Sequence, residues 1–249
     1  MSVEHEIRGR VLIITMKREA KRNALNPEMT AGIDAGMNRL EDDPELWCGI
    51  LTGGPSVFSA GADLTIGPGP PTPRGGLVGL ITRHRVKPLI AAVEGFAVGG
   101  GMELVLSCDL VVAATTARFG LPEVKRGLMA DFGGAFRAPQ ALPLNVAREM
   151  MLTGDDLTAE RAERLGFVNV LAEPGQALQR AVELAERICS NAPLAAREAL
   201  AVSALVARPD ETELWRQSDA AHERLLKTDD VREGLAAFFE KRKPSWKAR

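Results

Sequence analysis

Short apolar segments alternate with segments of helical periodicity in the first half of the chain, and this alternation limits the folds that it can adopt. Four of the apolar segments have the composition of buried strands: residues 11–16, 47–52, 88–93 and 110–114. A helix is predicted between the first two, because Asn26 and Pro27 suit its N-cap and first turn. Strands separated by helices favour an α/β architecture with parallel strands, in which a site forms from loops at the strand ends.

The second half of the chain is predicted to be mostly helical. After residue 140 the strand signal is weak apart from residues 167–171. Six helices are predicted there: residues 145–152, 158–165, 175–189, 194–207, 211–227 and 231–240. In the first half, residues 65–76 contain four prolines and four glycines, which exclude regular helix or strand and predict a mobile loop.

Length and charge exclude several classes of protein. A chain of 249 residues is expected to form one large domain, with or without an appendage. Its 31 basic and 33 acidic residues give a net charge of −2, which favours neither nucleic acid nor a membrane surface as partner. The first ten residues carry charges where a signal peptide has its apolar stretch, and the three cysteines are interpreted as buried small hydrophobes. We therefore expect a cytoplasmic protein.

Two glycine-rich loops, residues 58–63 and 95–104, each follow a predicted strand. Glycine lets backbone approach a ligand closely, and a helix that begins at Gly100 would aim unpaired N–H groups at an anion. Two such donors from separate loops would form an oxyanion hole. A tight turn that only serves helix packing is the alternative. A phosphate-binding loop is disfavoured, because no lysine followed by serine or threonine comes after the glycines.

Two glutamates near these loops are candidate acid–base groups. Glu103 lies just inside the helix that begins at Gly100, among apolar residues, and burial there would raise its pKa toward the range useful for proton transfer. Glu123 follows Pro122 twenty residues later. Each is also compatible with an ordinary first-turn glutamate that the helix dipole favours, so their spacing alone does not pair them.

Several motifs, in order along the chain, together resemble the crotonase (enoyl-CoA hydratase/isomerase) superfamily, and within it the enoyl-CoA hydratases. The motifs are Arg22-Asn23-Ala24-Leu25-Asn26, residues 58–63, 90–93 and 99–104, Cys108-Asp109, residues 119–123 with Gly127 and Gly133-Gly134, Leu152-Thr153-Gly154, and residues 162–168 and 229–243. The resemblance implies the crotonase (ClpP-like) α/β spiral of ββα units. It implies a core domain over residues 1–190 and a helical C-terminal segment, residues 191–249, that covers the site and contacts neighbouring subunits of a homo-trimer or a hexamer.

The resemblance also implies a chemistry. The backbone N–H groups of Ala62 and Gly100 would hold the thioester oxygen, Glu103 would deprotonate water, and Glu123 would exchange the proton at the α-carbon. The presence of both glutamates favours reversible addition of water to a 2-trans-enoyl-CoA. Residues implied in CoA binding are Arg22, Ala24, Ala60, Asp63, Leu64 and Lys241. Neither a metal nor a cofactor is implied beyond the CoA of the substrate.

The chain departs from the hydratase pattern at Asp131, where typical hydratases carry Pro-Gly-Ala-Gly-Gly. Acidic residues here resemble those of dienoyl-CoA isomerases and carnitinyl-CoA dehydratases, so an isomerase or dehydratase remains an alternative, as does a turn aspartate that caps the next helix. A non-catalytic acyl-CoA-binding protein is a further alternative, which both glutamates disfavour. Glu94 is interpreted as a loop substitution without mechanistic meaning. The three histidines fall outside the matched motifs.

Overall fold

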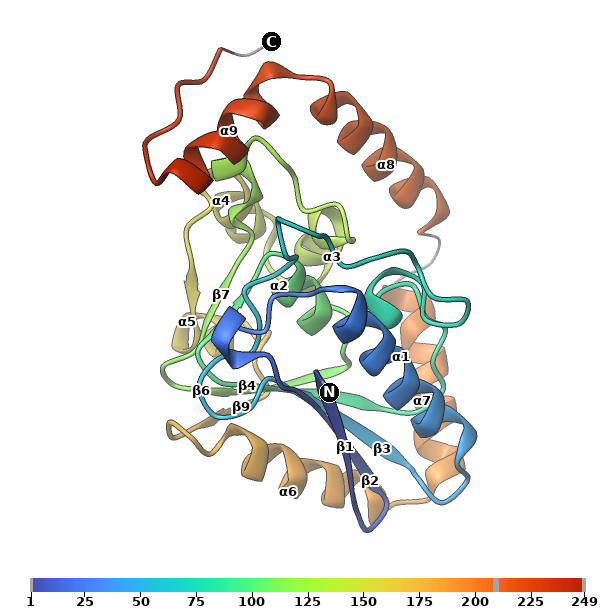
Figure 1. The fold of residues 1–249 in the computed structure, drawn as a ribbon. Helices are drawn as coiled ribbons and strands as arrows, with labels where there is room; N and C mark the ends of the chain where they lie inside the picture. Colours follow the sequence, from blue (N-terminus) through green and yellow to red (C-terminus); the bar gives the residue numbers. More distant parts are fainter. Residues whose placement is uncertain (1, 208–210, 248–249) are drawn as a thin grey trace.

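The computed structural model describes residues 2–207 and 211–247, and its centre is a six-stranded sheet (Figure 1). Its strand order is β1-β2-β3-β4-β6-β9. The strands are β1 (Val3–Arg8), β2 (Val11–Met16), β3 (Cys48–Thr52), β4 (Leu89–Val93), β6 (Leu110–Ala114) and β9 (Val170–Ala172). From β2 to β9 all neighbours are parallel, and β1 adds an antiparallel edge. The predicted α/β architecture with parallel strands is confirmed.

The two faces of this sheet carry separate apolar clusters, because side chains alternate along each strand. In β2, Leu12 and Ile14 face the larger cluster, which includes α1 (Pro27–Asp42). Val11 and Ile13 face the other cluster, which is covered by α6 (Ala177–Cys189). Figure 1 shows α1 and α2 on one side of the sheet and α6 on the other. The continuous apolar runs of the central strands are therefore explained by burial on both faces.

A smaller sheet lies above the main one and shapes the site. It consists of β5 (Phe96–Val98), β7 (Arg118–Gly120) and β8 (Leu157–Thr158), in that order. β5 follows β4 and leads into α2 (Gly100–Val105), and β7 follows β6 and leads into the 3₁₀ helix η3 (Pro122–Arg126). These are two successive strand–strand–helix units, which is the spiral that the resemblance implied.

The remaining helices follow the predicted positions with shifts of a few residues at their ends. They are α3 (Gly134–Ala141), α4 (Leu144–Thr153), α5 (Ala159–Arg164), α7 (Pro193–Ala207), α8 (Thr212–Leu226) and α9 (Asp229–Glu240), with short 3₁₀ helices η1 (Glu19–Lys21) and η2 (Leu77–Gly79). The N-cap prediction for α1 is confirmed, because Asn26 Oδ1 accepts a hydrogen bond from Met29 N at 2.9 Å. α3 was not predicted from the sequence, and Pro139 lies inside it.

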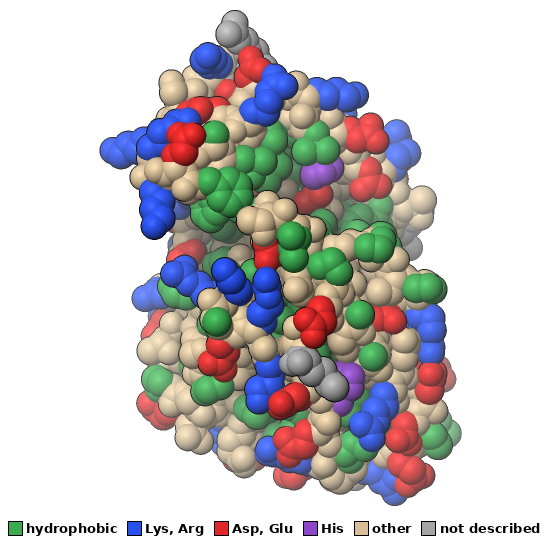
Figure 2. Space-filling model, viewed as in Figure 1, with side chains coloured by type: hydrophobic (Ala, Val, Ile, Leu, Met, Phe, Trp, Pro, Cys, Tyr) green, Lys and Arg blue, Asp and Glu red, His purple; other side chains and the backbone are tan. Residues whose placement is uncertain are grey.

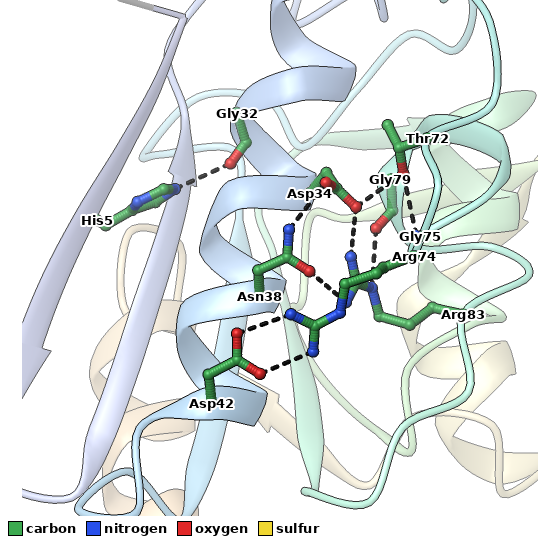
Figure 3. A network of polar contacts seen from close by, with 10 residues as sticks. All are labelled: His5, Gly32, Asp34, Asn38, Asp42, Thr72, Arg74, Gly75, Gly79 and Arg83. Atoms are coloured by element: carbon green, nitrogen blue, oxygen red, sulfur yellow. Dashed lines mark hydrogen bonds and ion pairs between the residues drawn. The ribbon is translucent and has the colours of Figure 1, made fainter.

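Residues 65–76 form no regular element before η2, as expected, but they are tied to α1 by side-chain hydrogen bonds (Figure 3). Thr72 Oγ1 donates to Asp34 Oδ1 at 2.7 Å, and the Arg74 guanidinium binds both carboxylate oxygens of Asp42 at 2.7 and 2.8 Å. These contacts hold the loop along one face of the helix. The mobility of the loop stays a prediction. The hydrogen bonds to α1 would restrict the motion of the loop.

The interpretation of Glu94 as a loop substitution omits a structural role. Its side chain is buried at the end of β4, and Oε1 accepts a hydrogen bond from Ala177 N at 2.9 Å. The carboxylate thus satisfies an N–H group in the first turn of α6, where an acidic group is favoured.

The helical C-terminal part of the chain begins near the predicted boundary. α6 ends at Cys189 and α7 begins at Pro193. The division into a core of residues 1–190 and a segment of residues 191–249 stays a prediction. Over residues 2–207 and 211–247, every helix is too short or too polar to cross a membrane.

Candidate active site

The loop at residues 58–63 is held in place by the fully buried side chain of Asn23. Its Nδ2 group donates to the carbonyl oxygens of Gly53 at 2.8 Å, Val57 at 2.9 Å and Phe58 at 3.1 Å. Its Oδ1 accepts from Arg18 N at 2.7 Å. One amide therefore satisfies three buried carbonyl groups, and it fixes the path of the backbone just before the first glycine-rich loop.

Residues 22–25 and 60–63 run side by side from this anchor. Ala60 N donates to Arg22 O at 2.9 Å, Leu25 N to Gly61 O at 2.8 Å, and Asp63 N to Leu25 O at 2.9 Å. The structure thus brings together five of the six residues that the resemblance implied for CoA binding: Arg22, Ala24, Ala60, Asp63 and Leu64.

The two predicted oxyanion donors, Ala62 and Gly100, are neighbours in space. A Cβ atom on Gly61, which has a φ of +88°, would lie 3.0 Å from Gly100 N, and one on Gly100 would lie 3.4 Å from Ala62 N. Both positions therefore need the close approach that glycine allows. Gly100 is the first residue of α2, so its N–H group has no acceptor within the helix.

Glu103 lies in the first turn of α2 and is 2% exposed. Gly134 N, at the start of α3, donates to Glu103 Oε1 at 2.9 Å. Burial and the negative charge of Glu123 hold the pKa of Glu103 well above its ordinary value, while the hydrogen bond from Gly134 opposes the rise. Glu103 is thus a buried carboxyl group whose charged form is favoured by backbone hydrogen bonds from Gly134 and Phe132.

Glu123 lies in the first turn of η3 and faces the same loop. A Cβ atom on Gly99 would lie 3.3 Å from Glu123 Oε1, and Gly99 is directly followed by the Gly100 donor. Glu123 Oε2 is buried and has no hydrogen-bond partner among the described residues. Burial, with a smaller effect from the charge of Asp131, raises the pKa of Glu123 to about 7.

Asp131 lies in the turn before α3 and does not cap that helix, whose N-cap is Gly133. Its Oδ2 atom instead lies 3.0 Å from Nδ1 of His222, on α8. Burial raises the pKa of the Asp131 carboxyl group, and the histidine opposes that rise. The structure therefore has a third carboxylate within electrostatic range of Glu103 and Glu123, and it excludes the helix-cap interpretation.

Some of the predicted CoA-binding residues have side chains already bound by other residues, and others have exposed side chains. The Asp63 carboxylate is already engaged by Thr65 and by Arg18 Nη1 at 2.8 Å, and these contacts lower its pKa to about 2. The Arg22 side chain is exposed. Lys241 is exposed at the C-terminal end of α9. Among the described residues, no hydrogen bond joins it to residues 22–25 or 60–63. The roles of all six residues stay predictions.

Three functional contacts were missed from the sequence. They are the Arg18–Asp63 ion pair, the hydrogen bond from Gly134 to Glu103, and the Asp131–His222 contact. The Gly133-Gly134 pair could have indicated the second of these, because a glycine at a helix start permits the approach of an acidic side chain. No local signal connects His222 with Asp131. Within the described residues, no group of three or more His, Cys, Asp or Glu side chains has the arrangement of a metal site.

Comparisons with known proteins agree with this geometry. The family described as "Enoyl-CoA hydratase/isomerase" matches residues 6–249. An enoyl-CoA hydratase of Mycobacterium tuberculosis is 37% identical, covering 98% of this chain and 96% of that protein. A carnitinyl-CoA dehydratase of Salmonella typhimurium is 37% identical, covering 97% and 96%. The crystal structure of a carnitinyl-CoA hydratase from Mycobacterium avium is 40% identical, with a TM-score of 0.92 and coverage of 100% and 99%.

A mostly parallel main sheet, strand–strand–helix units, and glycine-rich loops beside the buried Glu103 and the half-buried Glu123 define an α/β protein of the crotonase fold. The match extends over nearly the whole chain and is not confined to the site. The chain belongs to the enoyl-CoA hydratase/isomerase family, within the crotonase superfamily.

Proposed function

We propose that the protein adds water reversibly to the double bond of a 2-trans-enoyl-CoA, giving a 3-hydroxyacyl-CoA. One observation carries this proposal. The short stretch from Gly99 to Glu103 combines three parts of the site: the contact with Glu123 at Gly99, the unpaired N–H of Gly100, and the buried carboxyl group of Glu103. An oxyanion donor between two carboxyl groups is the arrangement that proton transfer next to a carbonyl group needs.

The proposed reaction assigns one step to each group. The thioester oxygen accepts hydrogen bonds from Ala62 and Gly100, and each donor contributes about 3 kcal/mol to the stability of the enolate-like transition state. Glu103 takes a proton from water as the water oxygen bonds to C3. Glu123 gives its proton to C2, and the electron pair of the double bond forms the new C2–H bond. One proton leaves Glu123 and one arrives on Glu103, so the charges balance.

The carboxyl groups have the acidities that these roles require. Two close buried carboxylates do not both ionise readily, so the pair shares a proton near neutral pH. A Glu123 pKa of about 7 lets this group both hold and release a proton near neutral pH, as proton transfer to C2 requires. When Glu123 is protonated, its repulsion of Glu103 disappears, and the Gly134 hydrogen bond favours ionisation of Glu103.

The test is the loss of enoyl absorbance when the protein meets a short 2-trans-enoyl-CoA. Glu103→Gln and Glu123→Gln are each expected to lower kcat by about 100-fold or more, because each removes a proton-transfer group. Glu160→Gln, an exposed glutamate at the start of α5, is the matched control and should retain wild-type activity. Hydration that survives either substitution at full rate would contradict the proposal.

Asp131 favours a second candidate, a double-bond isomerase or a carnitinyl-CoA dehydratase-like enzyme. The negative charge of Asp131 raises the pKa values of both Glu103 and Glu123, so this carboxyl group lies within electrostatic range of the pair. Reaction in ¹⁸O-labelled water separates the candidates: hydration incorporates the label, whereas movement of a double bond does not.

Inactivity on all enoyl-CoA and dienoyl-CoA substrates, with binding retained after both Glu→Gln changes, would instead indicate a non-catalytic acyl-CoA-binding protein.

We further propose that the substrate is held as its CoA thioester by residues 22–25 and 60–64. The names of the relatives, which are all CoA-thioester enzymes, support this class of substrate. Arg22 is exposed beside this pair of segments, where a guanidinium could meet a phosphate of CoA. Lys241 would reach such a phosphate from a neighbouring subunit of a trimer or hexamer.

A further inference from the structure

Helix α8 presents one stripe of side chains to the segment that carries Asp131. Glu211, Trp215, Ser218 and His222 recur at spacings of four, three and four residues, which puts them on one face of the helix. Ser218 is 5% exposed and His222 is half-buried, whereas Glu223 next to it is exposed. In Figure 1, α8 lies across the top of the molecule, over α3. The buried stripe therefore faces the site.

The contacts of this stripe converge on residues 131–137. At one end, the Arg137 guanidinium binds the Glu211 carboxylate at 2.8 and 3.1 Å. In the middle, the Trp215 ring packs edge-on against Phe136, with 5.0 Å between the ring centroids. At the other end, His222 Nδ1 lies 3.0 Å from Asp131 Oδ2. The same segment contacts Glu103 on its other side, through the N–H group of Gly134.

Several acidic groups surround Asp131, so its carboxylate needs a nearby group that favours its charged form. Glu103 and Glu123 lie on the side of α2 and η3, and Asp219 lies on α8, so three acidic groups repel an ionised Asp131. Arg126 offsets Glu123, and His222 offsets Asp131. Without the imidazole, the Asp131 carboxylate would face mainly like charges and would move away or take a proton. His222 Nδ1 is buried, it has no hydrogen-bond partner among the described residues, and the Asp131 carboxylate lies 3.0 Å from it.

We propose that His222 is a positioning residue of this site: its imidazole holds the Asp131 carboxylate, and through Asp131 it fixes the segment whose Gly134 N–H binds Glu103. The two atoms lie 3.0 Å apart without good hydrogen-bond alignment, so the proposal requires the ring to turn until its Nδ1–H group points at Asp131. The expected effect of His222 on kcat rests on the proposed hydration. The expected contact between His222 and Asp131, and its effect on Gly134, do not rest on it, so the two are tested separately.

The structural test uses NMR at a pH where the histidine rings are neutral. Nδ1 of His222 is expected to carry the ring proton in the wild type, and the Nε2–H tautomer should replace it in Asp131→Ala. His5 is an internal control, because its Nε2 atom bonds the Gly32 carbonyl oxygen at 2.9 Å and its tautomer should not change. The Gly134 amide resonance should shift in His222→Phe but not in Glu223→Gln. An unchanged His222 tautomer or an unchanged Gly134 resonance would overturn the proposal.

The kinetic test compares two replacements of the histidine. His222→Phe keeps a ring but loses the donor, and kcat should fall about tenfold with a smaller change in KM. His222→Asn places an N–H donor near the Nδ1 position and should recover much of the loss, whereas Glu223→Gln should leave kcat unchanged. In an Asp131→Ala background, which removes the acceptor of the His222 contact, His222→Phe should add no further loss. A full additional loss there would show that His222 acts otherwise than through Asp131.

If the wild type hydrates no enoyl-CoA, the proposed function fails, while the tautomer and the Gly134 resonance still decide the structural part. If the wild type is active and His222→Phe retains full kcat, the positioning role fails, and the hydratase assignment is unaffected.

Discussion

At the scale of single residues, the site contains carboxyl groups whose surroundings disfavour their charged forms. Glu103 is buried beside Glu123, and Glu123 Oε2 has no hydrogen-bond partner among the described residues. Each carboxyl group therefore has a raised pKa, because its charged form is poorly solvated. Groups arranged for proton transfer in this way usually reduce the stability of the fold.

This cost can be measured on Glu123. Its pKa rises from 4.5 to about 7 on folding, so the folded chain binds the proton more tightly than the unfolded chain does. The resulting stabilisation is complete below the unfolded pKa and is lost as the pH rises through the folded pKa. At pH 8, Glu123→Gln should therefore have a larger free energy of unfolding than the wild type, by up to about 3 kcal/mol. Below pH 4.5 the difference should close.

Urea unfolding at a series of pH values checks this expectation, with Glu160→Gln as the exposed control. A difference between Glu123→Gln and the wild type that does not vary with pH would show that the charge of Glu123 is not the source of the cost.

The sequence predicted the residues of this site that local motifs mark. Glu103 and Glu123 each follow a glycine-rich or proline-containing turn; the structure puts Glu103 against Gly134 and Glu123 against Gly99, and their catalytic roles stay predictions. His222 could not be predicted, because its contact with Asp131 depends on how α8 folds back over α3. Arg18 was missed for a similar reason: its carboxylate partner, Asp63, lies on a segment that only the folded chain brings beside it.

At the scale of elements, two ion pairs of different burial join α1 to the chain that follows β3: one from Arg74 in the loop of residues 65–76, and one from Arg83 after η2 (Figure 3). The Arg83 side chain is 2% exposed and that of its partner Asp34 is 16% exposed. Arg83 Nη1 also donates to Asn38 Oδ1 at 2.9 Å. In the second pair, the side chains of Arg74 and Asp42 are 50% and 61% exposed. Burial, more than distance, should decide which pair matters to the fold.

Arg83→Leu should lower the free energy of unfolding by about 3 kcal/mol, because it leaves the part-buried Asp34 carboxylate without its cation. Arg74→Leu should cost less than about 1 kcal/mol, because water solvates the Asp42 carboxylate. Urea unfolding of the two variants at pH 7 compares the pairs directly. Equal losses would mean that the loop contact at Arg74 contributes more than its exposure indicates.

The elements that the sequence missed lack a strong local signal. β1 has apolar residues only at Val3 and Ile7 and is mostly exposed, so neither an apolar run nor alternation marked it. β5 and β7 are three residues long, and their pairing depends on chain segments that are distant in sequence. α3 contains Pro139, which usually argues against a helix. Long amphipathic helices such as α6 were predicted within two residues at each end, because the periodic pattern determines them.

At the scale of the whole molecule, apolar surface is distributed unevenly. Figure 2 shows hydrophobic side chains in a recess beneath the C-terminal helices, where a cavity of about 440 Å³ lies between η3 and the corner of α8 and α9. A second apolar surface lies on α7. Leu194, Val202 and Leu205 are 70%, 63% and 68% exposed, and their spacing of eight and three residues puts them on one helix face. Large side chains gathered in this way favour a subunit contact.

The resemblance implies a homo-trimer or hexamer, and we propose that α7 is buried between its subunits. Each large aliphatic side chain covered there would contribute about 1.5–3 kcal/mol, which is enough to make the assembly sensitive to a single charge. Size-exclusion chromatography with light scattering should give three or six times the 26.7 kDa chain mass. The double change Val202→Glu and Leu205→Glu should give single chains, whereas Ser203→Glu, on the opposite side of the helix from Leu194, should not. Single chains in the wild type, or equal dissociation by both changes, would place the subunit contact elsewhere.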